Sequence, residues 1–529
     1  MKYNKHFSTK ETPQNEKTPG STQVPNSAGG FSFAVNKWVR LERFLILGSE
    51  GGTYYATEAK LTKDNATGVL ECIKEDGPRV VATVVAISHA GRAPKNDPAL
   101  FVLAMASALG SEEARRLAFA ALPKVARIGT HLFHFAEYRQ AFGGWGRGMR
   151  RAVGQWYVNK DVEKLAMQVV KYQGRDGWTN RDLLRLSHPY GTPKQNTIFK
   201  WVVKGELAKG APALLKAFEE AKTLKPTKAG IQAILRLIET HELPREALPT
   251  EFLAQPEVWE ALLPHMGLTA LIRNLGTMTK VGLVKPLSAA SKEAVRRLND
   301  AEDLKKSRVH PIQVLTALLT YKSGHGRKGK GTWDPVGQVT DALDEAFYAS
   351  FGNVEPTGKN IMLALDVSGS MSSDEVAGVS GLTPRMASAA MAMVTARTEK
   401  EHVIMAFSSG FVRLNITPKM RLDNICEATA RLPFDGTDCS LPMAFAEKNK
   451  LDIDTFVVYT DSETWSGGIR PPQALQKYRR ALQPKAKLVV VGMVSNEFTI
   501  ADPNDAGMLD VVGFDTNTPA VIQDFTRGS

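Results

Sequence analysis

Residues 361–371 read IMLALDVSGSM, an apolar run followed by an aspartate and then by two serines at alternate positions. A short apolar run without alternating polar residues is typical of a strand buried on both faces. Similar runs recur through the last third of the chain, with helical stretches between most of them. This alternation predicts a parallel sheet covered by helices on both sides, a doubly wound α/β domain. Further strands are expected at 402–408, 411–416, 455–460 and 488–494, and helices at 385–399, 421–431, 440–449 and 471–482.

Oxygen-bearing side chains follow these predicted strands. Asp366, Ser368 and Ser370 leave the first strand; Thr437 precedes a predicted helix, and Asp461 follows the run TFVVYT. Because ligands of such sheets bind beyond the carboxyl ends of the strands, the five side chains are expected at one rim. Carboxylates and hydroxyls without histidine or cysteine suit Mg²⁺, with Mn²⁺ as the alternative. The set resembles the metal-ion-dependent adhesion site of von Willebrand factor A domains, which bind partners and are not usually enzymes.

Other interpretations of this motif are weaker. Taken alone, Asp366 and its serines could cap the following turn and helix, but Thr437 and Asp461 at matching positions favour a metal site. A phosphatase-type aspartyl nucleophile usually has a second aspartate where Ser368 stands. The stretch 324–330, GHGRKGK, lacks the Ser or Thr that must follow in a P-loop, and we interpret it as a flexible basic linker. We therefore predict no enzymatic activity.

The chain before this domain has helical periodicity. Apolar residues recur at three- and four-residue spacing, and Pro, Gly, Ser or Asn separate the segments, with Ser111 and Thr179 placed to cap helices. Successive short helices without strands between them predict an α-solenoid of the HEAT type, with an irregular helical domain as the alternative. The predicted fold is therefore multidomain: 1–30 a disordered polar leader, 31–355 the helical domain and 356–529 the α/β domain.

Charge is divided unevenly along the 529 residues, whose formal net charge is +12. Residues 1–350 hold 50 basic and 34 acidic side chains, a net charge of +16, whereas residues 351–529 hold 17 and 21, a net charge of −4. The whole cationic excess lies in the helical part, which indicates a polyanion-binding region joined to a domain with another task.

Three stretches of the helical part combine cations with aromatic residues: 127–133, 143–157 and 171–188. In the third, Lys171 and Arg175 would share one helix face, and His188 would lie at a helix–helix corner. Cations beside aromatic faces fit single-stranded or loop RNA better than a duplex groove. The alternative is a solvated charged face with the tryptophans in the core.

Several phrases of the sequence, in collinear order, resemble one family. They are LERFLILGSEGGTYY at 41–55, RIGTHLF at 127–133, WGRGMRRA at 145–152, DGWTNRDLLRLSH at 176–188, GHGRKGK at 324–330, VEPTGK at 354–359, DVSGSM at 366–371 and GTDCSLPM at 436–443. The chain is similar in these phrases to the TROVE-domain Ro autoantigen family, the RNA-binding Ro ribonucleoproteins, most of all to a bacterial orthologue. The resemblance implies a ring of HEAT-like helices closed by a von Willebrand factor A domain.

The resemblance also implies two RNA sites and a set of partners. Small non-coding Y RNA would bind a basic outer surface, and single-stranded 3′ ends of misfolded non-coding RNAs would enter a central hole, for RNA quality control and processing. In bacteria an exoribonuclease would be a further partner, tethered by Y RNA. Lys171, Arg175 and His188 correspond to Y RNA-binding positions. Further RNA-binding candidates lie in shared phrases: Arg127, His131, Arg147, Arg150 and Arg151.

The remaining expectations concern the compartment and the alternative function. Three scattered cysteines, no apolar leader and no window long enough for a membrane span indicate a cytoplasmic protein without membrane contact, which we expect to be monomeric. The alternative function is a divalent-metal-dependent adhesion module in which the basic helices are only scaffold.

Overall fold

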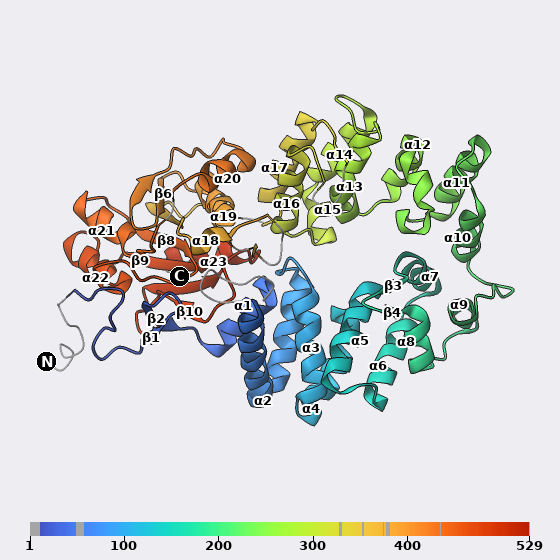
Figure 1. Ribbon diagram of the computed structural model, residues 1–529, viewed down its shortest axis with the longest axis horizontal. Helices are drawn as coiled ribbons and strands as arrows, with labels where there is room; N and C mark the ends of the chain where they lie inside the picture. The colour runs from blue at the N-terminus through green and yellow to red at the C-terminus, as the bar shows by residue number, and fades with distance from the viewer. Residues whose placement is uncertain are drawn as a thin grey trace.

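The computed structural model describes residues 11–48, 58–326, 331–351, 354–373, 375–376, 381–433 and 435–527. Parts of two sequence motifs, 49–55 and 327–330, and the first ten residues of the predicted leader lie outside the described residues. A curved array of helices occupies most of the molecule, and a domain built on a sheet lies beside it (Figure 1).

The helical array runs from α1 to α17 and also contains the short 3₁₀ helices η1–η3. Where helices begin as predicted, side chains cap them: Ser111 Oγ accepts from the Ala114 amide, and Thr179 forms a reciprocal capping box with Asp182. The helices are α1 (Lys37–Leu47), α2 (Glu58–Ala90), α3 (Asp97–Leu109), α4 (Glu112–Val125), α5 (Gly129–Gly143), α6 (Arg147–Val158), α7 (Val162–Lys171), α8 (Asn180–Ser187), α9 (Pro193–Lys204), α10 (Ala213–Thr223), α11 (Lys228–His241), η1 (Arg245–Ala247), η2 (Thr250–Ala254), α12 (Pro256–Leu262), η3 (Leu263–His265), α13 (Leu268–Lys280), α14 (Ala289–Leu298), α15 (Ala301–Ser307), α16 (Pro311–Lys322) and α17 (Gly337–Ala349).

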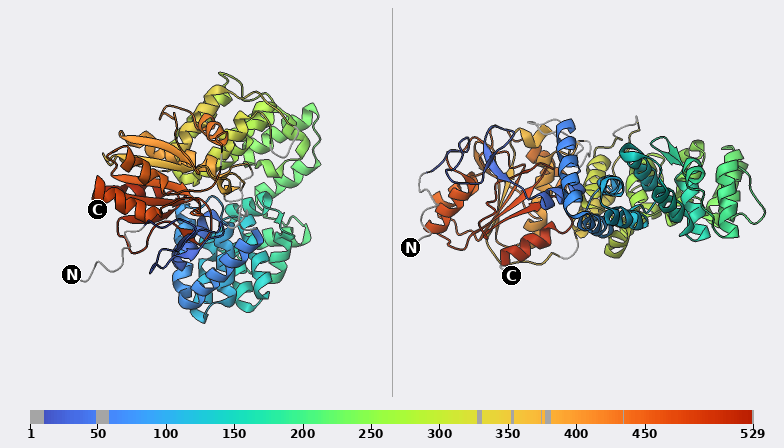
Figure 2. Two further views of the ribbon diagram at one scale, coloured as in Figure 1. Left: turned by 60° about the vertical axis from the view of Figure 1, so that its left-hand side comes forward. Right: turned by 90° about the horizontal axis from the view of Figure 1, so that it is seen from below.

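The array curves until its two ends meet. Helices α2 to α8 follow one side, α9 to α11 make the turn, and α12 to α17 return (Figure 1); Figure 2 shows the array edge-on beside the other domain. At the junction, His310 Nε2 lies 3.1 Å from the Arg92 carbonyl oxygen, and Gln313 Nε2 donates to the Pro94 carbonyl over 2.7 Å. The predicted ring of helices is confirmed, and its ends also contact each other directly, beside the domain expected to close the ring.

The C-terminal domain has a six-stranded sheet in the order β11-β9-β8-β5-β6-β7. Strands β5 and β8 lie in its interior and are buried on both faces, as expected from their continuous apolar sequences. The sheet is parallel except at its edge, where β7 returns antiparallel to β6 through a short turn. The elements are β5 (Ile361–Asp366), α18 (Ser370–Ser373), α19 (Pro384–Thr398), β6 (His402–Phe407), β7 (Phe411–Arg413), α20 (Leu422–Ala430), α21 (Leu441–Lys448), β8 (Thr455–Thr460), α22 (Pro471–Ala481), β9 (Lys487–Gly492), β11 (Met508–Val512) and α23 (Thr518–Arg527).

The doubly wound α/β prediction is confirmed, but it omitted the edge strand β11. This strand carries Asp510 in its middle, which breaks the apolar run that marks the other strands. The charge is tolerated because Arg43, from helix α1, donates to both Asp510 carboxylate oxygens over 2.7 and 2.8 Å. The partner of Asp510 is 467 residues away in the chain, so no local pattern could reveal it.

Residues 11–34, here called the N-terminal segment, lie along the C-terminal domain. Their short strands β1 (Val24–Pro25) and β2 (Phe31–Ala34) pair antiparallel with each other, and β2 also pairs with β10 (Phe498–Thr499). The disorder expected for residues 1–30 is therefore wrong for residues 11–30, which follow the surface of the distant domain.

Specific hydrogen bonds explain why so polar a segment is ordered. Gln14 is fully buried, and its side-chain amide donates to Asp438 Oδ1 over 2.7 Å and to the Ile469 carbonyl over 2.8 Å. Asn26 Nδ2 donates to the Thr464 carbonyl over 2.9 Å. A polar segment can be ordered when its buried polar groups form hydrogen bonds. Amino-acid composition alone does not reveal the partners of those hydrogen bonds.

Replacing Gly30 by alanine should displace this segment. A Cβ atom at Gly30 would lie 1.9 Å from the Thr464 carbonyl oxygen, so the two backbones must separate. We expect the free energy of unfolding in urea to fall by about 1–3 kcal/mol, the usual cost of overpacking. Gly468→Ala is the matched control, because nothing lies within 4 Å of the added atom. Equal stability of the two variants would contradict the contact.

Candidate functional site

The five predicted metal ligands come together at the carboxyl edge of the sheet. Asp366 ends β5, and Asp461 directly follows β8, the parallel neighbour of β5. Thr437 lies in the loop before α21. Hydrogen bonds connect this loop to the loop after β8, because the Trp465 and Ser466 amides both donate to the Thr437 carbonyl over 3.1 Å. The topology thus places the motif residues from three separate loops at one position.

Local hydrogen bonds orient the carboxylate of Asp366. Its Oδ1 accepts from the Ser368 amide over 2.9 Å, and its Oδ2 accepts from Thr460 Oγ1 over 2.6 Å. The hydroxyls of Ser368 and Ser370 lie 3.1 Å apart. Sequence reasoning missed Thr460, although its place as the last residue of an otherwise apolar strand marked it as facing this edge.

The five side chains are deeply buried, and some of their polar atoms lack partners. All five side chains are at most 1 % exposed. Thr437 Oγ1 and Asp461 Oδ2 are buried and have no hydrogen-bond partner among the residues that the structure describes. Burial, together with the charge of Asp461, raises the pKa of Asp366 to about 7, and burial raises the pKa of Asp461. Two buried carboxylates beside hydroxyl oxygens fit a divalent ion, which would stabilise both charges and satisfy both atoms.

The N-terminal segment reaches the loops that hold these ligands. Gln14 contacts Asp438, the neighbour of Thr437, and the hydroxyl of Thr464 donates to Gln14 Oε1. Ser32 Oγ donates to the carbonyl of Ser462, the neighbour of Asp461, over 2.8 Å. The N-terminal segment therefore contacts the backbone and side chains of two of the loops that carry the candidate ligands.

A cationic surface begins at α6. Arg147, Arg150 and Arg151 lie in the first turns of this helix and are exposed, and none has an ion pair with another described residue. Positive side chains at a helix N-terminus oppose the helix dipole, and the first turn of α6 contains no acidic residue to offset them. An anion bound there would interact favourably with both the arginines and the free amides of the helix.

The second cationic stretch follows α7. The helix ends at Lys171, and Arg175 lies in the two-residue strand β3 (Gly174–Arg175), which pairs with β4 (Trp178–Thr179). The expectation that Lys171 and Arg175 share a helix face is therefore wrong, because the chain turns into a hairpin. His188 is exposed at the C-terminal cap of α8, as predicted, with a left-handed backbone at φ 45°.

One aromatic contact joins the two stretches. Trp145, in the loop before α6, packs against Trp178 of the hairpin with ring centroids 5.6 Å apart. This contact brings the α6 arginines and Arg175 to one region of the surface. Trp156, in contrast, is fully buried, so it belongs to the core and offers no stacking face. Tyr190, which sequence reasoning passed over, is 88 % exposed two residues after His188.

Arg127 and His131 lie at the start of α5 and contact residues of α2 and of the loop before α3. Arg127 donates to the hydroxyl and the carbonyl of Ser88 over 2.8 and 3.0 Å. His131 Nδ1 lies 3.3 Å from Asn96 Nδ2, and burial lowers the pKa of His131 to about 3, so its ring is neutral. The geometry favours a structural role for both residues in place of the RNA contact expected of them.

Comparisons with known proteins agree with this architecture. The TROVE domain model matches residues 24–239 and 203–319, and the Ro60 vWA domain model matches residues 360–526. The RNA-binding protein RO60 of Deinococcus radiodurans is 45 % identical over 520 residues, which cover 98 % of this chain and 97 % of the relative. The protein of the same name from Caenorhabditis elegans is 35 % identical, covering 98 % and 92 %.

A solved structure gives the same result. The crystal structure of the Deinococcus radiodurans RO (RSR) protein matches with a TM-score of 0.69 and 43 % identity, covering 93 % of this chain and all of that one. Among the described residues, no helix is both long and apolar enough to cross a membrane.

The fold and its two sites define a class of protein: a closed ring of helices with an exposed cationic surface, completed by a von Willebrand factor A domain. In that domain the five side chains predicted as metal ligands lie together at one edge of the sheet. The chain belongs to the Ro family and is an orthologue of its bacterial members.

Proposed function

We propose that this protein is a non-catalytic RNA-binding protein that takes part in RNA quality control and processing. It would hold Y RNA on its cationic outer surface and the single-stranded 3′ ends of misfolded non-coding RNAs in the opening of the ring. The observation that carries the proposal is the set of exposed arginines at the start of α6, which the Trp145–Trp178 contact joins to the hairpin. Such cations beside aromatic rings suit RNA phosphates and unpaired bases.

The names of the relatives support RNA as the polyanion, since both are RNA-binding proteins. The proposal extends to the partners: a cytoplasmic monomer would use Y RNA to tether an exoribonuclease. The names of the relatives give the adhesion alternative no support.

The combined substitution Lys171→Ala with His188→Ser tests the RNA surface. Both side chains are at the ends of helices and contribute little to the core, so the variant should fold. We expect Y RNA affinity in a gel-shift titration to fall about tenfold, because the variant loses the Lys171 ammonium and the His188 imidazole from the surface that would contact phosphates. Unchanged affinity in a folded variant would contradict this assignment of the site.

We further propose that the von Willebrand factor A domain binds Mg²⁺, with Mn²⁺ as a substitute. Asp366, Ser368, Ser370, Thr437 and Asp461 would supply its oxygen ligands, directly or through waters. The two unsatisfied atoms, Thr437 Oγ1 and Asp461 Oδ2, support this proposal. The ion would stabilise the arrangement of the three loops and would perform no chemistry on RNA.

Removing one carboxylate should abolish the effect of the ion on stability. For the wild-type protein we expect Mg²⁺ at about 100 times its dissociation constant to add about 2.7 kcal/mol to the free energy of unfolding. Asp461→Ala should show no such gain in thermal melts with and without the ion. Asp435→Asn is the control. Asp435 lies in the loop of Thr437, is exposed, and forms a hydrogen bond only with Ser409 among the described residues. A gain in Asp461→Ala equal to that of the control would contradict the ligand set.

A further inference from the structure

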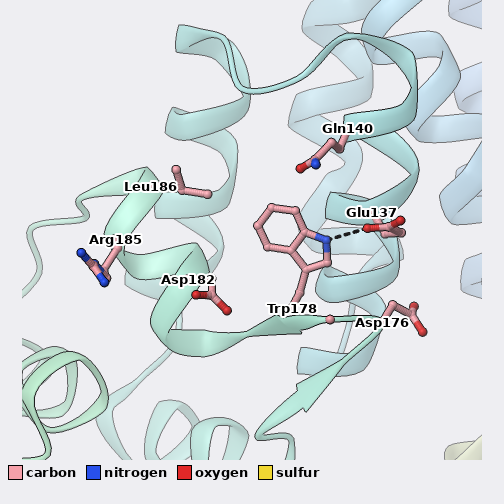
Figure 3. Close-up of a pocket in the computed structure, with 8 residues that line it drawn as sticks. Glu137, Gln140, Asp176, Trp178, Asp182, Arg185 and Leu186 are labelled. Atoms are coloured by element: carbon pink, nitrogen blue, oxygen red, sulfur yellow. Dashed lines mark hydrogen bonds between the residues drawn. The ribbon is translucent and has the colours of Figure 1, made fainter.

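A pocket of 660 Å³ opens within the cationic surface, between α5, the β3–β4 hairpin and α8. In Figure 3 the indole of Trp178 stands in its middle, with Glu137 and Gln140 on one side and Asp182 and Leu186 on the other. A pocket of this size is large enough for a nucleobase. The same hairpin carries Trp178 and the RNA-binding candidate Arg175.

The charge inside the pocket is opposite to the charge around it. Its lining includes the carboxylates of Glu137, Asp176 and Asp182, and a single cation, Arg185, among the described residues. Phosphate groups would be repelled from such a pocket, although the surrounding arginines attract them. The occupant must therefore be an uncharged part of an RNA chain that donates hydrogen bonds.

Both carboxylates beside the indole are held in place and keep one oxygen available. Glu137 Oε2 accepts from Trp178 Nε1 over 2.8 Å, and Asp182 Oδ2 accepts from the Thr179 amide and hydroxyl over 3.0 and 2.6 Å. The other oxygen of each has no hydrogen-bond partner among the described residues. The pocket thus presents fixed acceptors next to an aromatic face.

We propose that this pocket binds an unpaired guanine of the RNA, an inference that rests on the proposed function. Guanine presents two adjacent donors, N1–H and N2–H, on its Watson–Crick edge, and both can point at the free oxygen of one of these carboxylates. Adenine and cytosine have an acceptor next to their amino group, and uracil has carbonyls on both sides of its N–H. In each of these bases a lone pair would therefore face the carboxylate and repel it. Trp178 supplies a stacking surface, and Arg185 can donate to guanine O6 and N7.

Base discrimination by the full-length protein tests the inference. We would titrate single-stranded RNA heptamers that differ only in the central base, guanine, inosine, adenine, cytosine or uracil in a uridine context, by fluorescence anisotropy. The guanine heptamer should bind about tenfold more tightly than the adenine, cytosine and uracil heptamers, as expected for one specific contact to a base edge. Inosine lacks the N2 amino group and should bind less tightly than guanine.

The double variant Glu137→Gln with Asp182→Asn should abolish this preference. Both substitutions keep an acceptor for Trp178 and Thr179 but place an amide donor against the donors of guanine. Glu239→Gln with Glu260→Gln removes the same charge at exposed positions on α11 and α12 and should keep the preference. If the first variant does not fold, the comparison of the inosine and guanine heptamers with the wild-type protein still tests the guanine pocket.

Different results would overturn the guanine pocket and the proposed function. Equal affinity of the wild-type protein for all five heptamers, or a guanine preference that survives the double variant, would overturn the guanine pocket while Y RNA binding stays intact. If the wild-type protein bound no RNA at all, both the guanine pocket and the proposed function would be overturned.

Discussion

Replacing Arg43 by alanine is expected to lower the free energy of unfolding by about 3–5 kcal/mol, the range found when one partner of a buried ion pair is removed. Arg43 lies on α1 but is fully buried against the C-terminal domain. Besides its paired contact with Asp510, it donates to the carbonyls of Asn496 and Phe498 over 3.1 and 2.9 Å. The alanine variant leaves all these acceptors without their donor and leaves a cavity as well.

A neighbouring arginine provides the matched control. Arg40 also lies on α1 and pairs with Glu497 at 2.7 Å, but the Glu497 side chain is 46 % exposed. Because solvent screens such a pair, Arg40→Ala should cost at most about 1 kcal/mol. Urea denaturation followed by tryptophan fluorescence would measure both variants. A smaller loss for Arg43→Ala than for Arg40→Ala would show that the buried contact does not hold the first helix to the domain.

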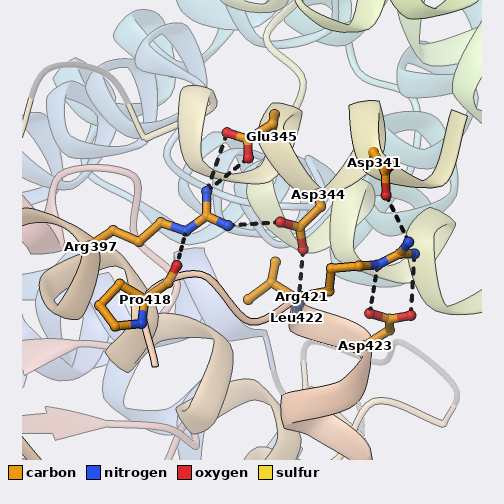
Figure 4. A network of polar contacts seen from close by, with 8 residues as sticks. All are labelled: Asp341, Asp344, Glu345, Arg397, Pro418, Arg421, Leu422 and Asp423. Carbon is orange, nitrogen blue, oxygen red and sulfur yellow. Dashed lines mark hydrogen bonds and ion pairs between the residues drawn. The ribbon is translucent and has the colours of Figure 1, made fainter. Parts of the chain in front are cut away.

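The other end of the ring reaches the same domain through more exposed contacts (Figure 4). Arg397 on α19 donates to Asp344 over 2.9 Å and to Glu345 over 3.1 Å, both on α17. Arg421 pairs with Asp341, whose side chain is 65 % exposed. Since α17 also precedes the domain directly in the chain, this junction depends less on any one ion pair than the junction at Arg43 does.

The triple substitution of Arg147, Arg150 and Arg151 by alanine should weaken RNA binding on the order of 100-fold at physiological salt. These arginines stand at a helix start, where their removal also relieves repulsion with the helix dipole, so the variant should be at least as stable as the wild type. If each contacts one phosphate, the slope of log affinity against log salt should become shallower by about two to three units.

A second triple variant separates local contacts from total charge. Lys292, Lys305 and Lys306 are exposed on α14 and α15, away from the hairpin, and have no ion pair with a described residue. Their replacement by alanine removes the same charge and should change affinity less than threefold. Equal losses in both variants would mean that the net charge of the ring attracts RNA and that the start of α6 makes no specific contact.

The parts of the fold that could be predicted are those with local signals. The buried strand ending at Asp366 has an unbroken apolar sequence, and the cap at Thr179 lies three residues before its partner Asp182. The meeting of the candidate ligands was predictable because parallel strands end at one edge, which turns distant positions such as Asp461 into neighbours.

What could not be predicted depends on partners far away in the chain. Asp510 and Gln14 look unsuited to a strand and to a buried position until Arg43 and Asp438 lie beside them. The tight hairpin at Arg175 interrupts a helical pattern within a few residues, and Asp176 takes a positive φ there. His131 carried the same sequence signal as His188, and its contact with Asn96 and its lowered pKa distinguish it only in the structure.

The pairing of the N-terminal segment with the C-terminal domain has a consequence for the order of folding during synthesis. The residues that Gln14 contacts lie 424 and 455 positions later in the chain. Strands β1 and β2 can therefore dock only after almost the whole chain has been synthesised. Contacts of such high sequence separation form late and slowly, and an unpaired strand edge is prone to aggregate meanwhile. We therefore expect β2 of the nascent chain to need protection by a chaperone until β10 has emerged.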